Sequence, residues 1–100
     1  MTYWLYILHC NNDTYYTGYT TDLLRRYREH QIGSAKCKYT RSFKPRSMVQ
    51  CWPFDDKSLV LRLECKIKAL SRAHKEHLIA EPSQLIVLIR ELTAARLSKC

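Results

Sequence analysis

The sequence predicts one small domain of the α/β (α+β) class, in which strands and helices share a single core. One hundred residues, 46% of them hydrophobic, are enough for one buried core but not for two. Three short segments rich in aromatic and branched side chains are typical of strands, and later segments repeat apolar residues at helical spacing. Only two glycines and three prolines are present, which leaves little linker-like sequence, so we expect a single domain over residues 1–100.

The first two predicted strands form a hairpin. Residues 3–9 are dense in aromatic and branched residues, an Asn-Asn-Asp turn segment follows, and residues 15–20 read as the second strand. Because side chains alternate between the faces of a sheet, Tyr6 and Tyr16 share a face only if Leu8 lies opposite Tyr16 or at an even offset from it. The sequence leaves this register open.

A helix is expected to follow the hairpin and to end near His30. Thr20 or Thr21 can cap its first turn, where Asp22 is also favourable. Asp22, Arg26 and His30 recur every four residues and therefore share one face of this helix. Another face can meet the core through Leu23, Leu24 and Tyr27.

The middle of the chain predicts a basic loop, a third strand and a buried helix. Residues 31–45 lack a clear period, whereas residues 46–52 resemble a strand closed by Pro53. Asp55 and Asp56 open the helix, whose buried stripe consists of Val60, Leu63, Ile67 and Leu70.

The last part of the chain predicts a shorter helix over residues 75–80 and an extra C-terminal helix over about residues 82–98. Pro82 is tolerated in the first turn of that helix. Its strong apolar face consists of Leu85, Leu88, Ile89, Leu92 and Leu97. We expect this face to pack on the domain itself, with a homodimer through the helix as the alternative.

The distribution of charge points to a polyanionic partner. The net charge is +8, and residues 23–46 alone hold eight basic residues against the single acid Glu29, a net of +7. A concentrated cationic segment favours nucleic acid, because neutralised phosphates release counterions. The competing interpretation is a solvated basic face without a partner.

Cysteine usage fits a reducing cytosol, so we expect a cytoplasmic protein. The five cysteines are an odd number and show no CxxC spacing, which is unlike a secreted disulfide framework; we expect buried or idle thiols at Cys10, Cys37, Cys51, Cys65 and Cys100. No apolar run is long enough to span a bilayer, so we expect no membrane partner.

Two short tyrosine segments carry a family resemblance. Trp4-Leu5-Tyr6 and Tyr16-Thr17-Gly18 look like the paired signature of the GIY-YIG nuclease family. Residues 22–30 are similar to the family's helix with its arginine and histidine, and residues 63–68 resemble the later helix that carries a glutamate. The resemblance covers about residues 3–80 and is closest to small, single-domain bacterial members. Trp4 stands where the family often has glycine, and Leu5 and Thr17 stand where isoleucine is usual.

This resemblance implies a three-stranded antiparallel sheet flanked by helices, with the C-terminal helix outside the recognisable core. It also implies cleavage of nucleic acid phosphodiesters that depends on a divalent metal, Mg²⁺ or alternatively Mn²⁺. Carried over by position, Tyr6 and Tyr16 would line the site, Arg26 would face the phosphate, His30 would be an accessory group, and Glu64 would be the single protein ligand of the metal.

The chemistry of each group is compatible with such a site. An arginine fork meets phosphate oxygens bidentately, and Mg²⁺ needs only one or two carboxylates because it keeps most of its waters. A phenol can orient the attacking water, or take its proton if the phenol pKa falls from about 10 near cationic charge. Gly18 would let the backbone or a phosphate approach the sheet closely.

Each of these residues also has an ordinary structural interpretation. Strand tyrosines usually pack, Arg26 can contact phosphate without catalysis, His30 can complement a helix dipole, and Glu64 can pair with Lys68. Two nucleic-acid functions therefore stand side by side, and a dimerising adaptor that uses the C-terminal helix is a third possibility. The first is a metal-dependent endonuclease acting on DNA, or alternatively RNA. The second is a non-catalytic nucleic-acid-binding module that contacts phosphates through Arg25, Arg28, Lys36, Lys38, Arg41 and Lys44.

Overall fold

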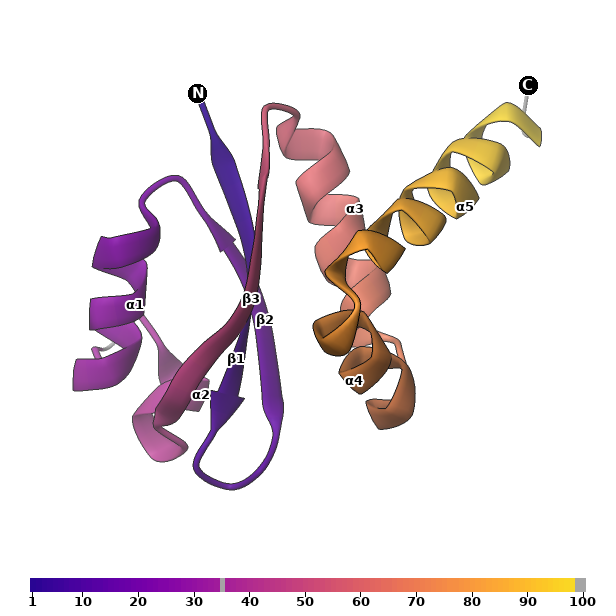
Figure 1. Ribbon diagram of the computed structural model, residues 1–100. Helices are drawn as coiled ribbons and strands as arrows, with labels where there is room; N and C mark the ends of the chain where they lie inside the picture. The colour runs from indigo at the N-terminus through magenta and orange to yellow at the C-terminus, as the bar shows by residue number, and fades with distance from the viewer. Residues whose placement is uncertain (35, 99–100) are drawn as a thin grey trace.

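The fold has three layers, with the sheet in the middle (Figure 1). The structure, a computed structural model, describes residues 1–34 and 36–98. The strands are β1 (Tyr3–Cys10), β2 (Tyr15–Thr20) and β3 (Pro45–Phe54). The helices are α1 (Leu23–Ile32), α2 (Lys38–Ser42), α3 (Lys57–Lys68), α4 (Arg72–Ala80), the 3-10 turn η1 (Pro82–Gln84) and α5 (Leu85–Ser98). Helices α1 and α2 cover one face of the sheet, and α3, α4 and α5 lie on the other side (Figure 1).

The sheet is antiparallel throughout, with β1 in the centre and β2 and β3 at the edges. The expected three-stranded antiparallel sheet flanked by helices is confirmed. In the hairpin, Leu8 lies opposite Tyr16 and Tyr6 lies opposite Gly18. The register is therefore the one that puts Tyr6 and Tyr16 on the same face of the sheet.

The two faces of the sheet have different roles. Leu5 and Ile7 join Val60, Leu63 and Ile67 of α3 in the main hydrophobic core. The alternate side chains of β1 point the other way, toward α1 and α2. The candidate site lies on the face covered by α1 and α2. The other face packs against α3 and forms the main hydrophobic core.

The start of α1 differs by one or two residues from the prediction. Asp22, and neither Thr20 nor Thr21, is the N-cap, since its side chain accepts a hydrogen bond from Arg25 N at 3.1 Å. The Thr20 hydroxyl does not cap the helix, because it accepts a hydrogen bond from the backbone N–H of Asp22 at 3.1 Å instead. Leu24 was expected to face the core, but it is 83% exposed.

Three further elements differ in extent from the predictions. The segment expected to be a loop contains the short helix α2, which has no side-chain cap hydrogen bond at its N-terminus. Strand β3 continues through Pro53, which sits opposite Trp4; an edge strand tolerates this proline because the lost N–H need not face a neighbour. Helix α4 begins earlier than expected, at Arg72, because the Ser71 side chain caps it by accepting from His74 N.

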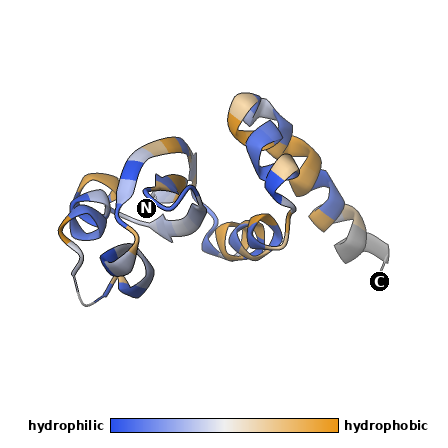
Figure 2. Ribbon diagram, turned by 90° about the horizontal axis from the view of Figure 1, so that it is seen from below, coloured by the Kyte–Doolittle hydropathy of each residue, from blue (hydrophilic) through white to orange (hydrophobic). Residues whose placement is uncertain are grey.

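Helix α5 packs on its own chain, as expected. Leu85 is buried in the core, and Leu88, Ile89 and Leu92 pack against it; Leu97 lies outside the side chains that the structure describes. The Trp52 Nε1–H donates to the Pro82 carbonyl at 3.2 Å and ties the preceding turn to β3. Figure 2 shows more hydrophobic positions along α5 than along α1, which is mostly hydrophilic. In the described part of the chain, no helix is both long and apolar enough to cross a membrane.

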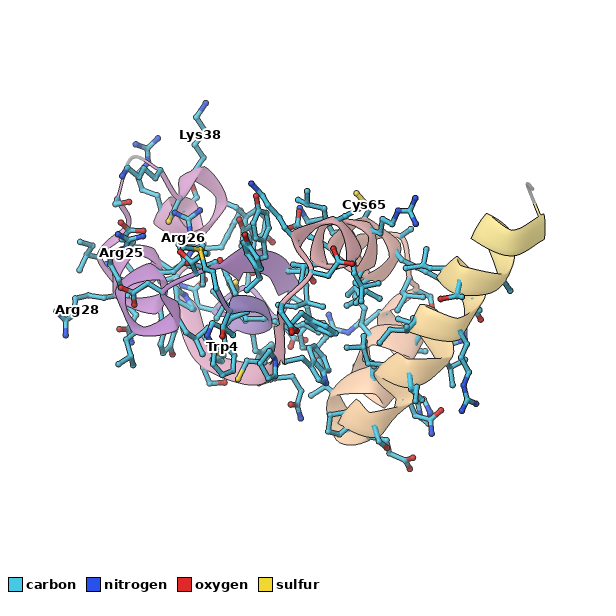
Figure 3. The ribbon with its side chains drawn as sticks, turned by 90° about the horizontal axis from the view of Figure 1, so that it is seen from above. Trp4, Arg25, Arg26, Arg28, Lys38 and Cys65 are labelled. Atoms are coloured by element: carbon cyan, nitrogen blue, oxygen red, sulfur yellow. The ribbon has the colours of Figure 1, made fainter. Side chains whose placement is uncertain are left out.

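The four cysteines that the structure describes are free thiols. Cys10 and Cys37 are buried, Cys51 is half-buried, and Cys65 is exposed on α3, where Figure 3 shows it on the outer side. This agrees with the expected absence of a disulfide framework for these four residues.

Candidate active site

A buried hydrogen-bond chain joins the sheet to both helices on the α1 face. The Tyr6 Oη lies 2.7 Å from His30 Nε2, and the Nδ1 of the same imidazole lies 2.7 Å from Thr40 Oγ1. The Thr40 hydroxyl in turn donates to the Cys37 carbonyl at 3.4 Å. Tyr6, His30 and Thr40 are all almost completely buried, so this chain is part of the packed interior rather than a surface contact.

Tyr16 completes an aromatic cluster around the imidazole. Its ring centroid lies 6.5 Å from that of Tyr6 and 5.0 Å from that of His30, with the imidazole ring at 62° to it. These distances fall in the range of edge-to-face packing. Two strands and one helix therefore bring Tyr6, Tyr16 and His30 together, as the hairpin register requires.

Gly18 leaves the space that Tyr6 fills. A Cβ atom added at Gly18 would lie 2.6 Å from Tyr6 Oη, 2.8 Å from Tyr6 Cζ and 3.2 Å from Tyr16 Cε1. These separations are too short for ordinary contact, so a larger residue would displace the Tyr6 phenol. The glycine allows the close approach that was expected at this position, and the group that approaches is Tyr6 itself.

Burial shifts the pKa values of both hydrogen-bonded partners toward their neutral forms. Burial raises the pKa of Tyr6 well above its ordinary value, and the nearby Arg26 guanidinium offsets this only in part. Burial, together with the positive charge of Arg26, lowers the pKa of His30 to about 4, against a smaller opposing effect of Glu29. The cationic charge of Arg26 does lower the phenol pKa of Tyr6, but desolvation is the larger effect, so the net shift in the free chain is upward.

Arg26 is a half-buried cation next to the cluster. Its Nη1 lies 3.2 Å from Glu29 Oε1, one turn further along α1. Figure 3 shows Arg26 on the side of α1 that faces α2 and the sheet, whereas Arg28 points away into solvent. Arg26 is therefore the arginine of α1 that an anion at the cluster would meet.

Glu64 lies on a different layer from these residues. It belongs to α3, which packs on the opposite face of the sheet, mainly against β2 and β1. Its side chain is 17% exposed, and its Oε1 lies 3.0 Å from Lys68 Nζ. Within residues 1–34 and 36–98, no hydrogen bond or ion pair joins Glu64 to Tyr6, Arg26 or His30.

Glu64 lies on the flank of α3 opposite the one that carries Lys66, because residues two positions apart point to nearly opposite sides of a helix. Two residues further along, on the other flank of the helix, Lys66 Nζ pairs with Glu91 Oε2 of α5 at 2.9 Å. The turn before α5 is attached to the opposite edge strand, β3, by the bond from Trp52 to Pro82. The Glu64 carboxylate is thus on the flank of α3 away from Lys66 and α5, and α3 lies on the opposite side of the sheet from α1.

The donor set around Glu64 fits a metal ion only if a ligand completes the coordination shell. No group of three His, Cys, Asp or Glu side chains that could hold a metal is found in the described part of the chain. A single carboxylate is compatible with Mg²⁺, which is bound through one or two carboxylates, waters and substrate phosphates. The Glu64 carboxylate is also held by Lys68, so a cation would have to replace this ammonium group.

The predicted phosphate contacts all lie on the exposed surface of the α1 and α2 layer or its connecting segments. In the described residues none of the six takes part in an ion pair; they are Arg25, Arg28, Lys36, Lys38, Arg41 and Lys44. Figure 3 shows Lys38 pointing away from the body of the protein. Their charges are therefore free to interact with an external polyanion on the same side of the sheet as Tyr6.

The sequence did not predict the contribution of α2 to the site. Thr40 anchors the imidazole, and Tyr39 stacks on Tyr16 with ring centroids 5.8 Å apart. Tyr39 in turn contacts Phe43 at 5.2 Å, and these two rings are 36% and 39% exposed. The only available signal was a pair of aromatic residues within a basic segment, which identifies a surface but not a contact with His30.

Comparison with known proteins gives consistent matches. Residues 2–77 match the sequence family described as the GIY-YIG catalytic domain. A UPF0213 protein of Natronomonas pharaonis is 46% identical over 79 residues, which cover 79% of this chain and 92% of that protein. A UPF0213 protein of Halobacterium salinarum is 49% identical over 74 residues, or 74% of this chain and 95% of that protein.

A solved structure agrees with these sequence matches. The solution NMR structure of a UPF0213 protein from Bacillus halodurans has a TM-score of 0.51 and 38% sequence identity, and covers 86% of this chain and 94% of that chain. Helix α5 lies beyond the residues that match the family.

Proposed function

Because the chain belongs to the GIY-YIG family, as its tyrosine segments predicted, we propose that it is an endonuclease that hydrolyses phosphodiester bonds in DNA with the help of a divalent metal ion. The observation that carries the proposal is the buried hydrogen bond between Tyr6 and His30, with Tyr16 and Arg26 beside it. Converging groups of this kind are the criterion for an active site.

Tyr6 would orient the attacking water through its oxygen lone pairs. The phenol is neutral because burial raises its pKa, and in the proposed reaction it would donate its proton to His30 Nε2, 2.7 Å away. The remaining lone-pair capacity of the oxygen could accept a hydrogen bond from water once the bound substrate brings a water to the phenol, which is almost completely buried in the free chain. This role needs a neutral phenol, so the raised pKa is compatible with it.

His30 would receive the proton that the water loses. As the water oxygen bonds to phosphorus, its two O–H groups become more acidic; one of their protons passes to Tyr6 Oη and the other stays on the new P–OH, while the phenol proton passes to His30 Nε2. The bond from phosphorus to the leaving oxygen breaks, and that oxygen takes a proton from solvent. The imidazolium then returns its proton through Tyr6 to solvent, which restores both neutral groups.

Arg26 would bind a non-bridging oxygen of the same phosphate. In the free chain its guanidinium is paired with Glu29 at 3.2 Å, and both side chains are partly exposed. A single, partly exposed pair of this kind stabilises the free chain only modestly, so a phosphate can compete for the guanidinium. The planar fork is suited to the charge that develops on phosphate oxygens during hydrolysis.

Glu64 would hold the metal ion together with the substrate, and Mg²⁺ or Mn²⁺ is the class of ion that fits one carboxylate. When bound, such an ion supplies charge stabilisation for the phosphate and its leaving oxygen. For Glu64 and Tyr6 to act on one phosphodiester, the backbone of the substrate would have to pass around an edge of the sheet, because the two residues lie on opposite sides of it. The exposed basic residues beside α1 and α2 would hold the flanking phosphates.

The proposal is tested by cleavage of labelled duplex, branched and single-stranded DNA with Mg²⁺ or Mn²⁺. Glu64→Gln and Arg26→Lys should each reduce kcat strongly, because they remove the metal ligand and the bidentate fork. The matched controls are Glu76→Gln and Arg62→Lys, which alter an exposed acid and an exposed base on α4 and α3. Cleavage that is equally fast in Glu64→Gln and in the parent would show that a contaminant cuts the DNA.

The position of Glu64 favours a second candidate, a non-catalytic nucleic-acid-binding module. Glu64 is paired with Lys68 and lies on the helix layer opposite His30. Such a module would bind DNA in a salt-dependent manner, and neither EDTA nor Glu64→Gln would change its affinity. Binding without cleavage on every substrate and with both metals would select this alternative.

A further inference from the structure

Thr40 contacts the imidazole of His30 but has no role in the reaction proposed above. Its Oγ1 lies 2.7 Å from the Nδ1 of His30, on the side of the imidazole remote from Tyr6. Thr40 is fully buried and belongs to α2, whereas His30 belongs to α1 and Tyr6 to β1. Nothing else in the described residues hydrogen-bonds this nitrogen.

The direction of the two hydrogen bonds of His30 follows from the groups at the two ends of the hydrogen-bond chain, each of which can only donate or only accept. At one end, the Cys37 carbonyl only accepts, so the single Thr40 proton is used there and Thr40 Oγ1 must accept from the imidazole. At the other end, the Arg26 guanidinium near Tyr6 only donates, so the phenol proton has His30 Nε2 as its acceptor. Both ends require the same imidazole, with its one proton on Nδ1.

We propose that Thr40 is a positioning residue that fixes His30 in the Nδ1–H tautomer and thereby keeps Nε2 available for the Tyr6 proton. This inference rests on the proposed function for its catalytic meaning, but the tautomer is a property of the free protein. A second partner of a histidine commonly decides which ring nitrogen carries the proton. Without the hydroxyl, the Nδ1–H would be buried without an acceptor, which favours the other tautomer.

With the other tautomer, the site would lose its function as a proton acceptor. Nε2 would carry a hydrogen and would donate to Tyr6 Oη, so the phenol would no longer pass its proton to the imidazole. The phenol oxygen would then accept a hydrogen bond from His30 with a lone pair that could otherwise accept one from water. The groups that face this bond are Arg26 and Glu29 from α1, Tyr16 from β2 and Cys37 at the start of α2.

The first measurement is NMR of the ¹⁵N-histidine-labelled full chain near neutral pH, using long-range ¹H–¹⁵N correlations of the imidazole rings. We expect protonated Nδ1 and unprotonated Nε2 for His30 in the parent protein, and the same pattern in Thr40→Ser. In Thr40→Val, which keeps the shape but loses the hydroxyl, we expect a mixture or the Nε2–H tautomer. An Nε2–H signal in the parent overturns the proposal, as does an unchanged tautomer in Thr40→Val. If Thr40→Val does not fold, the parent spectrum alone still decides.

The second measurement is the steady-state kinetics of DNA cleavage. Thr40→Val should lower kcat by about 10- to 100-fold with little change in KM, by analogy with residues that orient histidine ligands, and Thr40→Ser should restore most of it. An equal loss of kcat in both variants would overturn the positioning role. Serine keeps the hydroxyl and valine does not, so a role that depends on the hydroxyl must affect the two variants differently. If the parent shows the expected tautomer but cuts no substrate, the nuclease proposal fails and the tautomer assignment stands.

Discussion

Acidification should destabilise the protein through His30. The imidazole is fully buried and hydrogen-bonded to Tyr6 Oη at 2.7 Å, and burial, together with the positive charge of Arg26, lowers its pKa from 6.5 to about 4. Between these two values the unfolded chain binds a proton that the folded chain does not. The stability that His30 contributes is therefore complete above about pH 6.5 and falls as the pH drops toward 4, below which no more is lost.

The size of this effect follows from the two pKa values. Each pH unit between 6.5 and about 4 costs about 1.4 kcal/mol, so protonation of His30 should remove about 3 kcal/mol in total. By about pH 5 the loss should already be about 2 kcal/mol, since the unfolded state is then mostly protonated and the folded state is not. A small domain has about 5–15 kcal/mol of stability, so this loss is easily measured.

The assay is urea unfolding followed by circular dichroism at several pH values between about 7 and 4. His30→Gln cannot titrate in this range, so its free energy of unfolding should fall less than that of the parent, by about 2 kcal/mol at about pH 5. The difference between the two proteins cancels the carboxylates that both contain. His77→Gln, which removes an exposed histidine on α4, should follow the parent. Parallel curves for the parent and His30→Gln would refute the buried neutral imidazole.

Three other substitutions test the packing and the charge of the molecule. Gly18→Ala should destabilise the fold by about 1–3 kcal/mol in urea unfolding and abolish cleavage, because its Cβ would lie 2.6 Å from Tyr6 Oη; unchanged stability would show that the phenol can move aside at no cost. Leu85→Ala should cost about 2–5 kcal/mol of unfolding free energy, since this side chain of α5 is buried in the core, whereas the exposed Ile86 gives a control variant, Ile86→Ala, with little expected effect. Lys38→Ala should lower the slope of log K against log salt for DNA binding by about one, while Lys57→Ala at the start of α3 should leave it unchanged; equal slopes for all three proteins would exclude Lys38 as a phosphate contact.

The hairpin and the main core could be predicted because short-range rules determine them. Alternation along β1 and β2 limits the register to two classes, and the observed pairing of Leu8 with Tyr16 belongs to the class that joins the two tyrosines. The stripe of Val60, Leu63 and Ile67 is visible at helical spacing and is fully buried. These features depend on residues a few positions apart, where the sequence carries a strong signal.

The α2 contribution could not be predicted, for two physical reasons. A five-residue helix is too short to show an apolar period, and the Cys37 side chain at its N-cap makes no capping hydrogen bond, so the usual N-cap signal is missing. Thr40 is therefore an ordinary polar residue in the sequence and becomes the partner of His30 only through the fold. The layer occupied by Glu64 was equally hidden, because the face that a helix covers depends on the path of the chain after β3.

The two shifted groups at the site depend on the same burial. Desolvation raises the pKa of Tyr6 and lowers that of His30, so both are neutral, and in the proposed tautomer the hydrogen bond runs from phenol to imidazole. The charge that remains beside them is the Arg26 guanidinium, offset in part by Glu29. A phosphate bound by Arg26 would place negative charge near His30, and a nearby anion favours the protonated imidazole. In the proposed reaction the imidazole would therefore become a stronger base only when the substrate is present, because the low dielectric that keeps it neutral in the free chain also amplifies the effect of the added charge.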